Sequence, residues 1–242
     1  MKIRYFDTLE STNNYCKLLN LKSVEEFTVI YAGKQSAGIG QQGNVWVSEP
    51  YKNLTFSLIL KPSFLSASDQ YQLTMMLAVA TAETVSTCLP HCKTSIKWPN
   101  DIYVDDNKIC GILTTCRIQN GQLADAICGI GLNVNQTEFP SWLPNPVSMK
   151  AIDNKEHDIS SILTLLLTKI QEQYYMMQSD SATLRARYLS LLYRRGIEAS
   201  YRYQGHTIQA TITGINSFGH LLLTSSSGET LCCDLKEIQF IK

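Results

Sequence analysis

Three β-prone runs between residues 95 and 134 constrain the fold of this chain more than any other feature. They read "TSIKW", "DIYVDDNKICGILTTCRI" and "LADAICGIGLNV". The turn signal "DDNK" divides the second run, and Asn120–Gly121 separates the second run from the third. An Asn-Gly pair between β-prone runs is a strong hairpin signal. The sequence therefore predicts an antiparallel meander over residues 95–134.

Other strands and helices are expected before this meander. Residues 2–6, 27–32 and 54–60 are short β-prone runs. Ser11 can cap a short helix between the first two, and an apolar helix is expected to follow the third. Together with the meander, these elements predict an α+β domain with a mixed, largely antiparallel sheet.

The ends of the longer helices have their own signals. Ser66 or Ser68 is expected to open the apolar helix, and Pro90 to stop it. Helical periodicity returns over residues 158–192, and Gly196 is the expected terminator. The sequence therefore predicts a boundary near residue 190.

The remainder of the chain has a different texture. From residue 197 onward, short strands alternate with turns at "QGH", "NSFGH" and "SSSGE". This pattern is typical of a small β-barrel. We therefore expect two domains, one over residues 1–190 and one over residues 191–242.

Composition excludes several classes of function. The 242 residues include 21 basic and 21 acidic side chains, so no excess of positive charge indicates a nucleic-acid partner. The start lacks the apolar core of a signal peptide, and no apolar run is long enough to cross a bilayer. We expect a cytoplasmic protein with no membrane partner.

The eight cysteines are scattered irregularly, which favours reduced thiols over disulfides in a chain without an export signal. Most are expected to be small core residues. The tightest cluster is Cys88, His91 and Cys92, and it has no second pair nearby to complete a tetrahedral set. We therefore predict no metal site.

Residues 33–46, "GKQSAGIGQQGNVW", have glycines at positions 38, 40 and 43. Such spacing suggests a loop that surrounds a phosphate-bearing ligand. Lys34 is the only charged residue in the segment, so the loop brings little charge to such a ligand.

The segment "IKWPNDIYV" ends a strand in a sharp turn, and Lys108 lies seven residues past Asp101. A hairpin through "DDNK" can return the lysine to the end of the sheet where the aspartate lies. The two side chains then face one pocket. The alternative is a solvated surface pair, which is common for such residues.

Two further polar segments each have two interpretations. "STNN", residues 11–14, is a helix cap or a set of hydroxyls and amides for a polar, neutral ligand group. "GIGLNVN", residues 129–135, contains glycines that permit close packing or that belong to a nucleotide loop. Within it, Asn133 can both donate to and accept from an adenine edge.

Taken in order, "STN", "Q..AG.G..G..W.S", "KWPND", "NKICGIL" and "GIGLNVN" resemble the catalytic domain of biotin protein ligases, over residues 1–185. The resemblance implies a class II synthetase-like biotin/lipoate ligase fold, followed by a small SH3-like β-barrel. Some members of this family also have an N-terminal helix-turn-helix. This chain begins almost at the first catalytic strand, so we expect no DNA-binding activity.

The family activates biotin with MgATP to biotinyl-5′-adenylate and then transfers biotin to a lysine of a carboxylase's biotin carboxyl carrier protein. By resemblance, Lys108 meets the biotin carboxylate and the α-phosphate, and Asp101 orients or deprotonates the incoming amine. The other residues implied for biotin are Ser11, Thr12, Asn13, Gln35, Gly38, Gly40, Gln41 and Gly111.

The resemblance also assigns residues to the nucleotide. Asn100 and Asn133 are implied to face it, and Trp46 to pack on the adenine or on the folded loop. The family's loop arginines are absent here, and the matching positions are Ile39, Gln41, Gln42 and Asn44. Backbone N–H groups can still surround an anion. We therefore expect Lys108 to supply most of the charge and the adenylate to be held less tightly.

Two other functions stay open. A lipoate or octanoate transferase has a similar fold, but the Trp-Pro-Asn-Asp turn, Gln35 and the appended strands favour biotin. A protein that binds biotin or its adenylate without efficient catalysis is supported only by the missing arginines, and Lys108 with Asp101 argues against it. The family includes monomers and homodimers, and the sequence does not choose between them.

Overall fold

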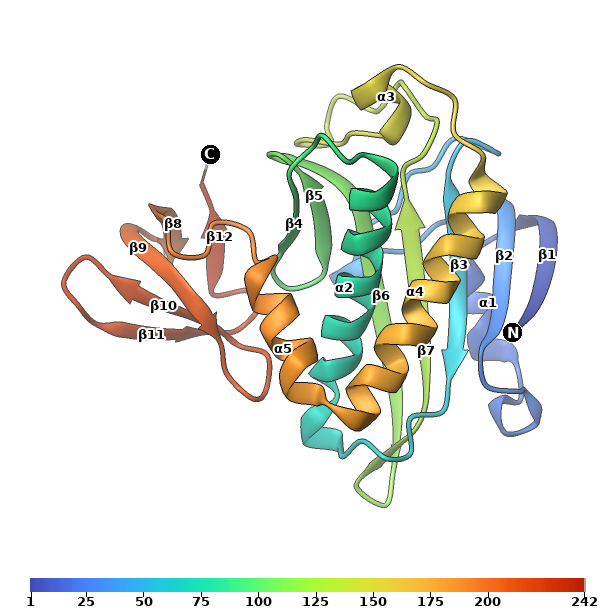
Figure 1. The fold of residues 1–242 in the computed structure, drawn as a ribbon, viewed down its shortest axis with the longest axis horizontal. Helices are drawn as coiled ribbons and strands as arrows, with labels where there is room; N and C mark the ends of the chain where they lie inside the picture. Colours follow the sequence, from blue (N-terminus) through green and yellow to red (C-terminus); the bar gives the residue numbers. More distant parts are fainter. Residues whose placement is uncertain (242) are drawn as a thin grey trace.

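The computed structural model describes residues 1–241, and the side chain of Gln42 lies outside its described part, as does Lys242 of the expected second domain. Two β-sheets lie beside each other (Figure 1). The larger has seven strands in the order β1-β2-β3-β7-β6-β5-β4, and the smaller has five in the order β11-β10-β9-β8-β12. The expected α+β class with a largely antiparallel sheet is confirmed.

The predicted meander is confirmed in the larger sheet. The strands of the larger sheet are β1 (Lys2–Leu9), β2 (Thr28–Gln35), β3 (Leu54–Leu60), β4 (Thr94–Lys97), β5 (Asp101–Val104), β6 (Asn107–Gln119) and β7 (Gln122–Leu132). β4 to β7 pair antiparallel in sequence order. At the β6–β7 turn, Asn120 and Gly121 have φ of 53° and 76°, the left-handed values that this hairpin type requires. Non-local pairing then joins β7 to β3, whereas β1 and β2 pair in parallel across a helix.

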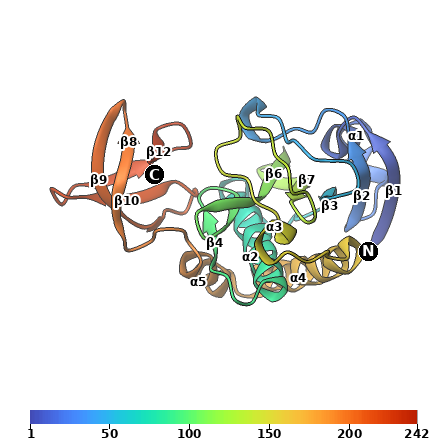
Figure 2. The same ribbon diagram turned by 90° about the horizontal axis from the view of Figure 1, so that it is seen from above.

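Helices cover both faces of this sheet (Figure 2). α2 (Tyr71–Cys88), α4 (Ile159–Ser179) and α5 (Ser181–Ser190) pack on one face, and α1 (Thr12–Leu18) packs on the other. Each face has its own apolar cluster, and β3 is buried along its whole length because it lies between them. The remaining short helices are η1 (Leu21–Ser23), η2 (Gln41–Gly43), η3 (Ala67–Asp69) and α3 (Met149–Asp153).

The predicted helix ends are right in two places and wrong in two. The Ser11 side chain accepts from the Asn14 N–H and caps α1, and α2 stops before Pro90. Neither Ser66 nor Ser68 opens α2: Ser66 precedes the 3-10 turn η3 and Ser68 lies within it, and α2 begins at Tyr71 without a side-chain cap. Gly196 does not end α5: the helix stops at Ser190, and Gly196, with φ of 74°, lies in the turn before the second sheet.

The second sheet confirms the short strands expected after residue 197. It consists of β8 (Glu198–Tyr203), β9 (His206–Ile215), β10 (Leu221–Ser225), β11 (Thr230–Cys233) and β12 (Ile238–Phe240). All neighbouring strands pair antiparallel. Apolar side chains on one side of it join the main core, so the two sheets share one apolar cluster.

All eight cysteines are free thiols, and all but Cys232 lie in or against the apolar clusters, as expected of reduced core residues. Within residues 1–241, no group of three His, Cys, Asp or Glu side chains is placed to hold a metal ion. In the same range, no helix is long and apolar enough to cross a membrane.

Candidate active site

A cavity of about 390 Å³ lies over the α1 face of the larger sheet. Its lining includes Ser11, Thr12, Asn13, Gln35, Gly40, Gln41, Trp46, Asn100, Asp101, Lys108 and Gly111, which are all of the predicted site residues except Gly38 and Asn133. Phe240 and its neighbours on β12 also line it, so the second sheet forms one side of this first cavity. Segments that lie far apart in the chain are thus brought together.

Strand register explains the base of the cavity. Cross-strand pairing places Lys97, Asp101, Gly111 and Gly131 in one row across β4, β5, β6 and β7. Paired residues point to the same face of a sheet. The two glycines, Gly111 and Gly131, therefore leave a flat backbone surface, which we call the glycine floor. Lys97 and Asp101 lie beside it in the same row.

The indole of Trp46 lies on the glycine floor. A Cβ added to Gly131 would lie 2.3 Å from Trp46 Cε2, and one added to Gly111 would lie 3.1 Å from Cζ3. The Trp46 Nε1 atom is buried, and it has no hydrogen-bond partner among the described residues. Only glycine at both positions lets the indole approach this closely.

Asp101 and Lys108 form an ion pair. Lys108 Nζ lies 2.7 Å from Asp101 Oδ1, with the side chains 33% and 20% exposed. The β5–β6 hairpin, with an irregularity after Ile102, returns Lys108 beside Asp101, as the spacing predicted. Both side chains line the first cavity and a second, adjoining one, so they are not a fully solvated surface pair.

Polar, neutral groups gather at the α1 end of the first cavity. Gln35 Oε1 accepts from the Thr12 N–H at 2.8 Å and from its hydroxyl at 3.2 Å. The Ser57 hydroxyl donates to Thr12 Oγ1 at 2.9 Å. Asn13 is buried, and neither its Nδ2 nor its Oδ1 has a partner in the described structure. An unpaired buried amide costs free energy unless a ligand satisfies it.

The glycine-rich loop folds into a small hairpin. The Gly40 N–H donates to Asn44 O at 2.7 Å, and the Trp46 N–H donates to Gly38 O at 2.9 Å. A Cβ on Gly38 would lie 2.5 Å from Trp46 O, so Gly38 permits this closure without lining the cavity itself. Ile39, Gln41 and Asn44 line the first cavity, whereas Lys34 is exposed and lines neither cavity.

The second cavity, of about 920 Å³, meets the first at Trp46, Lys97, Asp101 and Lys108. The segment after β7 forms its far side, including Asn133, Phe139, Trp142, Leu143, Pro144, Asn145 and Pro146. Asn133 Nδ2 donates to Val147 O at 3.0 Å, while its Oδ1 is buried without a partner in residues 1–241. The Nδ2 of Asn133 is thus part of a structural hydrogen bond, and its Oδ1 can accept a hydrogen bond from a ligand.

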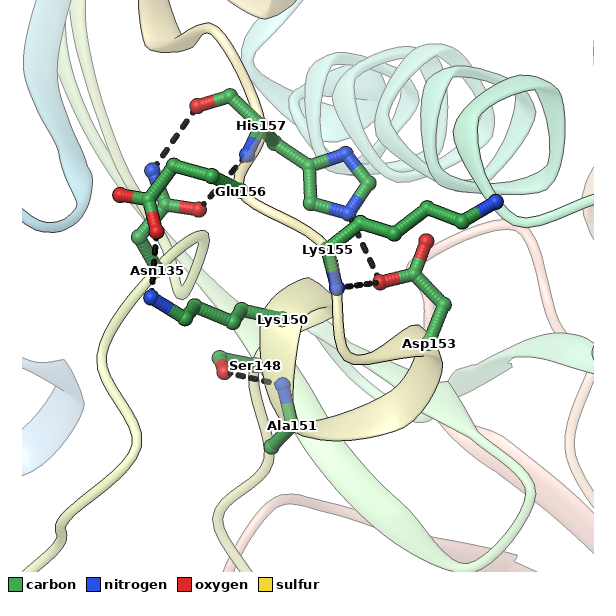
Figure 3. A network of polar contacts seen from close by, with 8 residues as sticks. All are labelled: Asn135, Ser148, Lys150, Ala151, Asp153, Lys155, Glu156 and His157. Carbon is green, nitrogen blue, oxygen red and sulfur yellow. Dashed lines mark hydrogen bonds and ion pairs between the residues drawn. The ribbon is translucent and has the colours of Figure 1, made fainter.

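A polar network fixes the segment behind Asn133 (Figure 3). The side chain of Asn135 donates to His157 O at 2.8 Å and accepts from the His157 N–H at 2.9 Å. His157 Nε2 lies 3.1 Å from Asp153 Oδ1, and Lys150 pairs with Glu156. These contacts join the two ends of the segment that contains α3, and so they hold the side of the second cavity in place.

The turn that precedes Asp101 is held from two sides. Trp98 Nε1 donates at 2.8 Å to Gly219 O, in the turn between β9 and β10 of the second sheet. The Tyr71 hydroxyl donates to Pro99 O at 3.1 Å and lies 2.8 Å from the Tyr188 hydroxyl. Burial raises the pKa of Tyr71 well above its usual value, so the phenol remains a donor. The sequence gives no local signal of these contacts because each joins residues far apart in the chain.

Asn100 is also engaged by its own fold. Its side-chain Nδ2 donates to Ile112 O, and its backbone carbonyl accepts from the Ile112 N–H at 3.1 Å. The residue lines the first cavity and not the second. Asn100 therefore fastens the Trp-Pro-Asn-Asp turn to β6, and its Oδ1 and the second N–H of its Nδ2 remain for a ligand.

Comparison with known proteins shows what the chain is similar to. The model of the biotin/lipoate A/B protein ligase family matches residues 5–133. The bifunctional ligase/repressor BirA of Bacillus subtilis is 30% identical over 228 residues, which cover 93% of this chain and 70% of that protein. A biotin–[acetyl-CoA-carboxylase] ligase of Paracoccus denitrificans is 27% identical over 208 residues, with 82% and 85% covered.

A solved structure shows the same fold over the whole chain. The biotin protein ligase of Aquifex aeolicus in complex with biotin and ATP superposes with a TM-score of 0.82 at 24% identity, covering 100% of this chain and 99% of that one. The family model alone covers more than half of the residues. The chain therefore belongs to the biotin/lipoate A/B protein ligase family.

Proposed function

We propose that this protein is an ATP-dependent biotin protein ligase, which forms biotinyl-5′-AMP and transfers the biotin to a specific lysine of a carboxylase's biotin carrier domain. The observation that supports this most directly is the pair of adjoining cavities that share Asp101 and Lys108. A reaction that joins an acid to a nucleotide needs two such sites meeting at one charged group.

Biotin fits the first cavity. Its ureido ring presents both N–H donors and a carbonyl acceptor, and the unpaired Nδ2 and Oδ1 of Asn13 offer the complementary groups. Thr12, Ser11 and Gln35 add further polar atoms at the same end. With the ring there, the valeryl chain extends through the first cavity toward Lys108.

Lys108 assists the first step. A biotin carboxylate oxygen attacks the α-phosphorus of ATP, the new P–O bond forms, and the bond to pyrophosphate breaks. Negative charge on the reacting phosphate is stabilised by the nearby ammonium, which is fixed by Asp101 before the reaction. Lys108 therefore affects turnover more than the binding of biotin.

Asp101 assists the second step. The carrier lysine attacks the acyl carbon of biotinyl-AMP, AMP leaves with the bonding electrons, and the amine loses a proton. A carboxylate beside the acyl group can accept this proton or orient the amine. Asp101 lines both cavities and is partly exposed, so an incoming side chain can reach it.

ATP enters as its magnesium complex. Mg²⁺ is usually bound through substrate phosphates and one or two carboxylates rather than by a complete protein site. This suits the described residues, among which no group of three metal-ligating acids or histidines occurs. The nucleotide is assigned to the second cavity, where the unpaired Asn133 Oδ1 can accept from the adenine amino group.

Further assignments belong to the same proposal. We divide the chain into a catalytic domain over residues 1–190 and an SH3-like domain over residues 191–242, which the five antiparallel strands of the second sheet support. We assign the protein to the cytoplasm. The loop positions without arginine predict weaker retention of biotinyl-AMP than an arginine-containing loop would give.

The test is transfer of radiolabelled biotin to a carboxylase carrier domain, with and without ATP. Lys108→Ala should abolish transfer while biotin binding persists, and Lys34→Ala, outside both cavities, should behave as the unmodified protein. A preference for labelled lipoate over biotin would show that lipoate, and not biotin, is the substrate. Tight biotin binding with no ATP-dependent pyrophosphate release would indicate a binding protein instead.

A further inference from the structure

Lys97 is a cation at the junction of the two cavities. The resemblance gave this residue no role. It lines both cavities, and strand register places it directly beside Asp101. Among residues 1–241, Lys108 and Arg194 are the other basic residues that line either cavity. The question is which of these three positive charges is available to an anionic ligand.

The other two cations are less suited to the junction of the cavities. Lys108 is paired with Asp101 at 2.7 Å. The guanidinium of Arg194 donates to Tyr193 Oη at 3.1 Å and to Ile241 O at 2.8 Å. Lys108 is thus compensated by a carboxylate, whereas Arg194 has no carboxylate partner among residues 1–241 but lines only the second cavity.

Lys97 is different. Its Nζ donates to Tyr103 Oη at 3.1 Å and lies 5.1 Å from the ring centres of both Tyr103 and Phe240. In the part of the chain that the structure describes, no carboxylate lies within 4.0 Å of it. An ammonium has three N–H donors, so two of them remain for a ligand.

The aromatic rings fix the ammonium without neutralising it. A cation over a ring face is attracted by the quadrupole of the ring, yet its full positive charge is kept. One ring comes from β5 and the other from β12 of the second sheet. Lys97 is therefore a preorganised, uncompensated cation, which suits a strongly anionic ligand.

We propose that Lys97 binds the β- and γ-phosphates of ATP, and that it thereby supplies from β4 the positive charge that the glycine-rich loop lacks. This inference rests on the proposed function. Lys108 then acts at the α-phosphate, and Lys97 holds the pyrophosphate group that leaves. The loop's own lysine, Lys34, cannot do so because it is exposed outside both cavities.

The alternative is that Lys97 only joins the two sheets through its aromatic contacts. Lys97→Met keeps most of the side-chain length and removes the charge, and Lys97→Arg keeps the charge. Lys34→Met is the matched control. The first measurement is calorimetric titration with magnesium pyrophosphate alone, because it needs neither biotin nor turnover.

Lys97→Met should weaken pyrophosphate binding and raise the KM for ATP by about 10- to 100-fold, the range of one charge-assisted hydrogen bond. The affinity for biotin should be unchanged, Lys97→Arg should retain most of the pyrophosphate affinity, and Lys34→Met should match the unmodified protein. If Lys97→Met does not fold, Lys97→Gln serves for the same titration.

Two results would overturn the assignment. One is pyrophosphate affinity in Lys97→Met equal to that of the unmodified protein, including the case in which only the unfolding temperature falls. The other is a parallel loss of biotin and pyrophosphate affinity. Absence of biotin-dependent pyrophosphate release by the unmodified protein would reject the proposed ligase function, and the titration would still decide the role of Lys97.

Discussion

Gly131→Ala tests whether the Trp46 indole needs the space that the glycine floor leaves. The new Cβ would lie 2.3 Å from Trp46 Cε2 and 2.6 Å from Nε1, where ordinary contacts begin at 3.4 Å. The indole must therefore move by about 1 Å or swing away. Because the Trp46 backbone closes the loop onto Gly38, displacement of the indole should loosen the loop as well.

The expected size follows from packing. Forcing one extra methyl group into a filled site costs about 1–3 kcal/mol. If that cost falls on the closed, ligand-bound form, retention of biotinyl-AMP weakens by about 5- to 150-fold. The loss of global stability should be smaller, because an indole on a surface loop can move out whereas the strands beneath it cannot.

The assay is quantification of biotinyl-AMP released into solution, together with urea denaturation. Gly214→Ala is the control, since its Cβ would meet only Leu189 Cδ2, at an ordinary 3.5 Å. Replacing Trp46 by Leu in the Gly131→Ala background should relieve the overlap and restore stability. Unchanged adenylate retention in Gly131→Ala would refute the reasoning, because the indole would then not need the space.

Two other predictions follow from buried groups. Trp98→Phe removes the donor to Gly219 O, so the free energy of unfolding in urea should fall by about 1–3 kcal/mol, and an unchanged value would contradict a structural role for this bond. Burial raises the pKa of the Cys16 thiol to about 12, so at about pH 8 it stays protonated and a thiol reagent should label the exposed Cys232 first. Equal labelling of both cysteines in the folded protein, read from peptide masses, would show that the Cys16 site opens.

Local chemistry explains what the sequence could predict. The β6–β7 hairpin depends on Asn120 and Gly121, and the start of α1 depends on Ser11, so nearby residues suffice. The approach of Lys108 to Asp101 is also local, because a single hairpin joins them. Local signals fail at helix ends where tertiary contacts override capping, as at the 3-10 turn before α2.

The remaining features depend on long-range pairing. The sequence does not reveal that Gly111 and Gly131 pair across two strands under Trp46, because the register must be known first. Phe240 enters the cavity lining from a separate sheet, and Lys97 acquires its meaning only when Asp101 and the second cavity are placed beside it. A lysine in a short strand gives no local signal of this kind.

The position of the first cavity between the two sheets has a thermodynamic consequence. Its lining comes from the larger sheet and from β12 of the smaller one, so a ligand that fills it contacts both. Such a ligand stabilises whichever unit would otherwise open first, by about 2.7 kcal/mol at a hundred times its dissociation constant. Occupancy thus adds to the coupling that the shared apolar cluster gives, and a saturating ligand should raise the unfolding temperature of both sheets together.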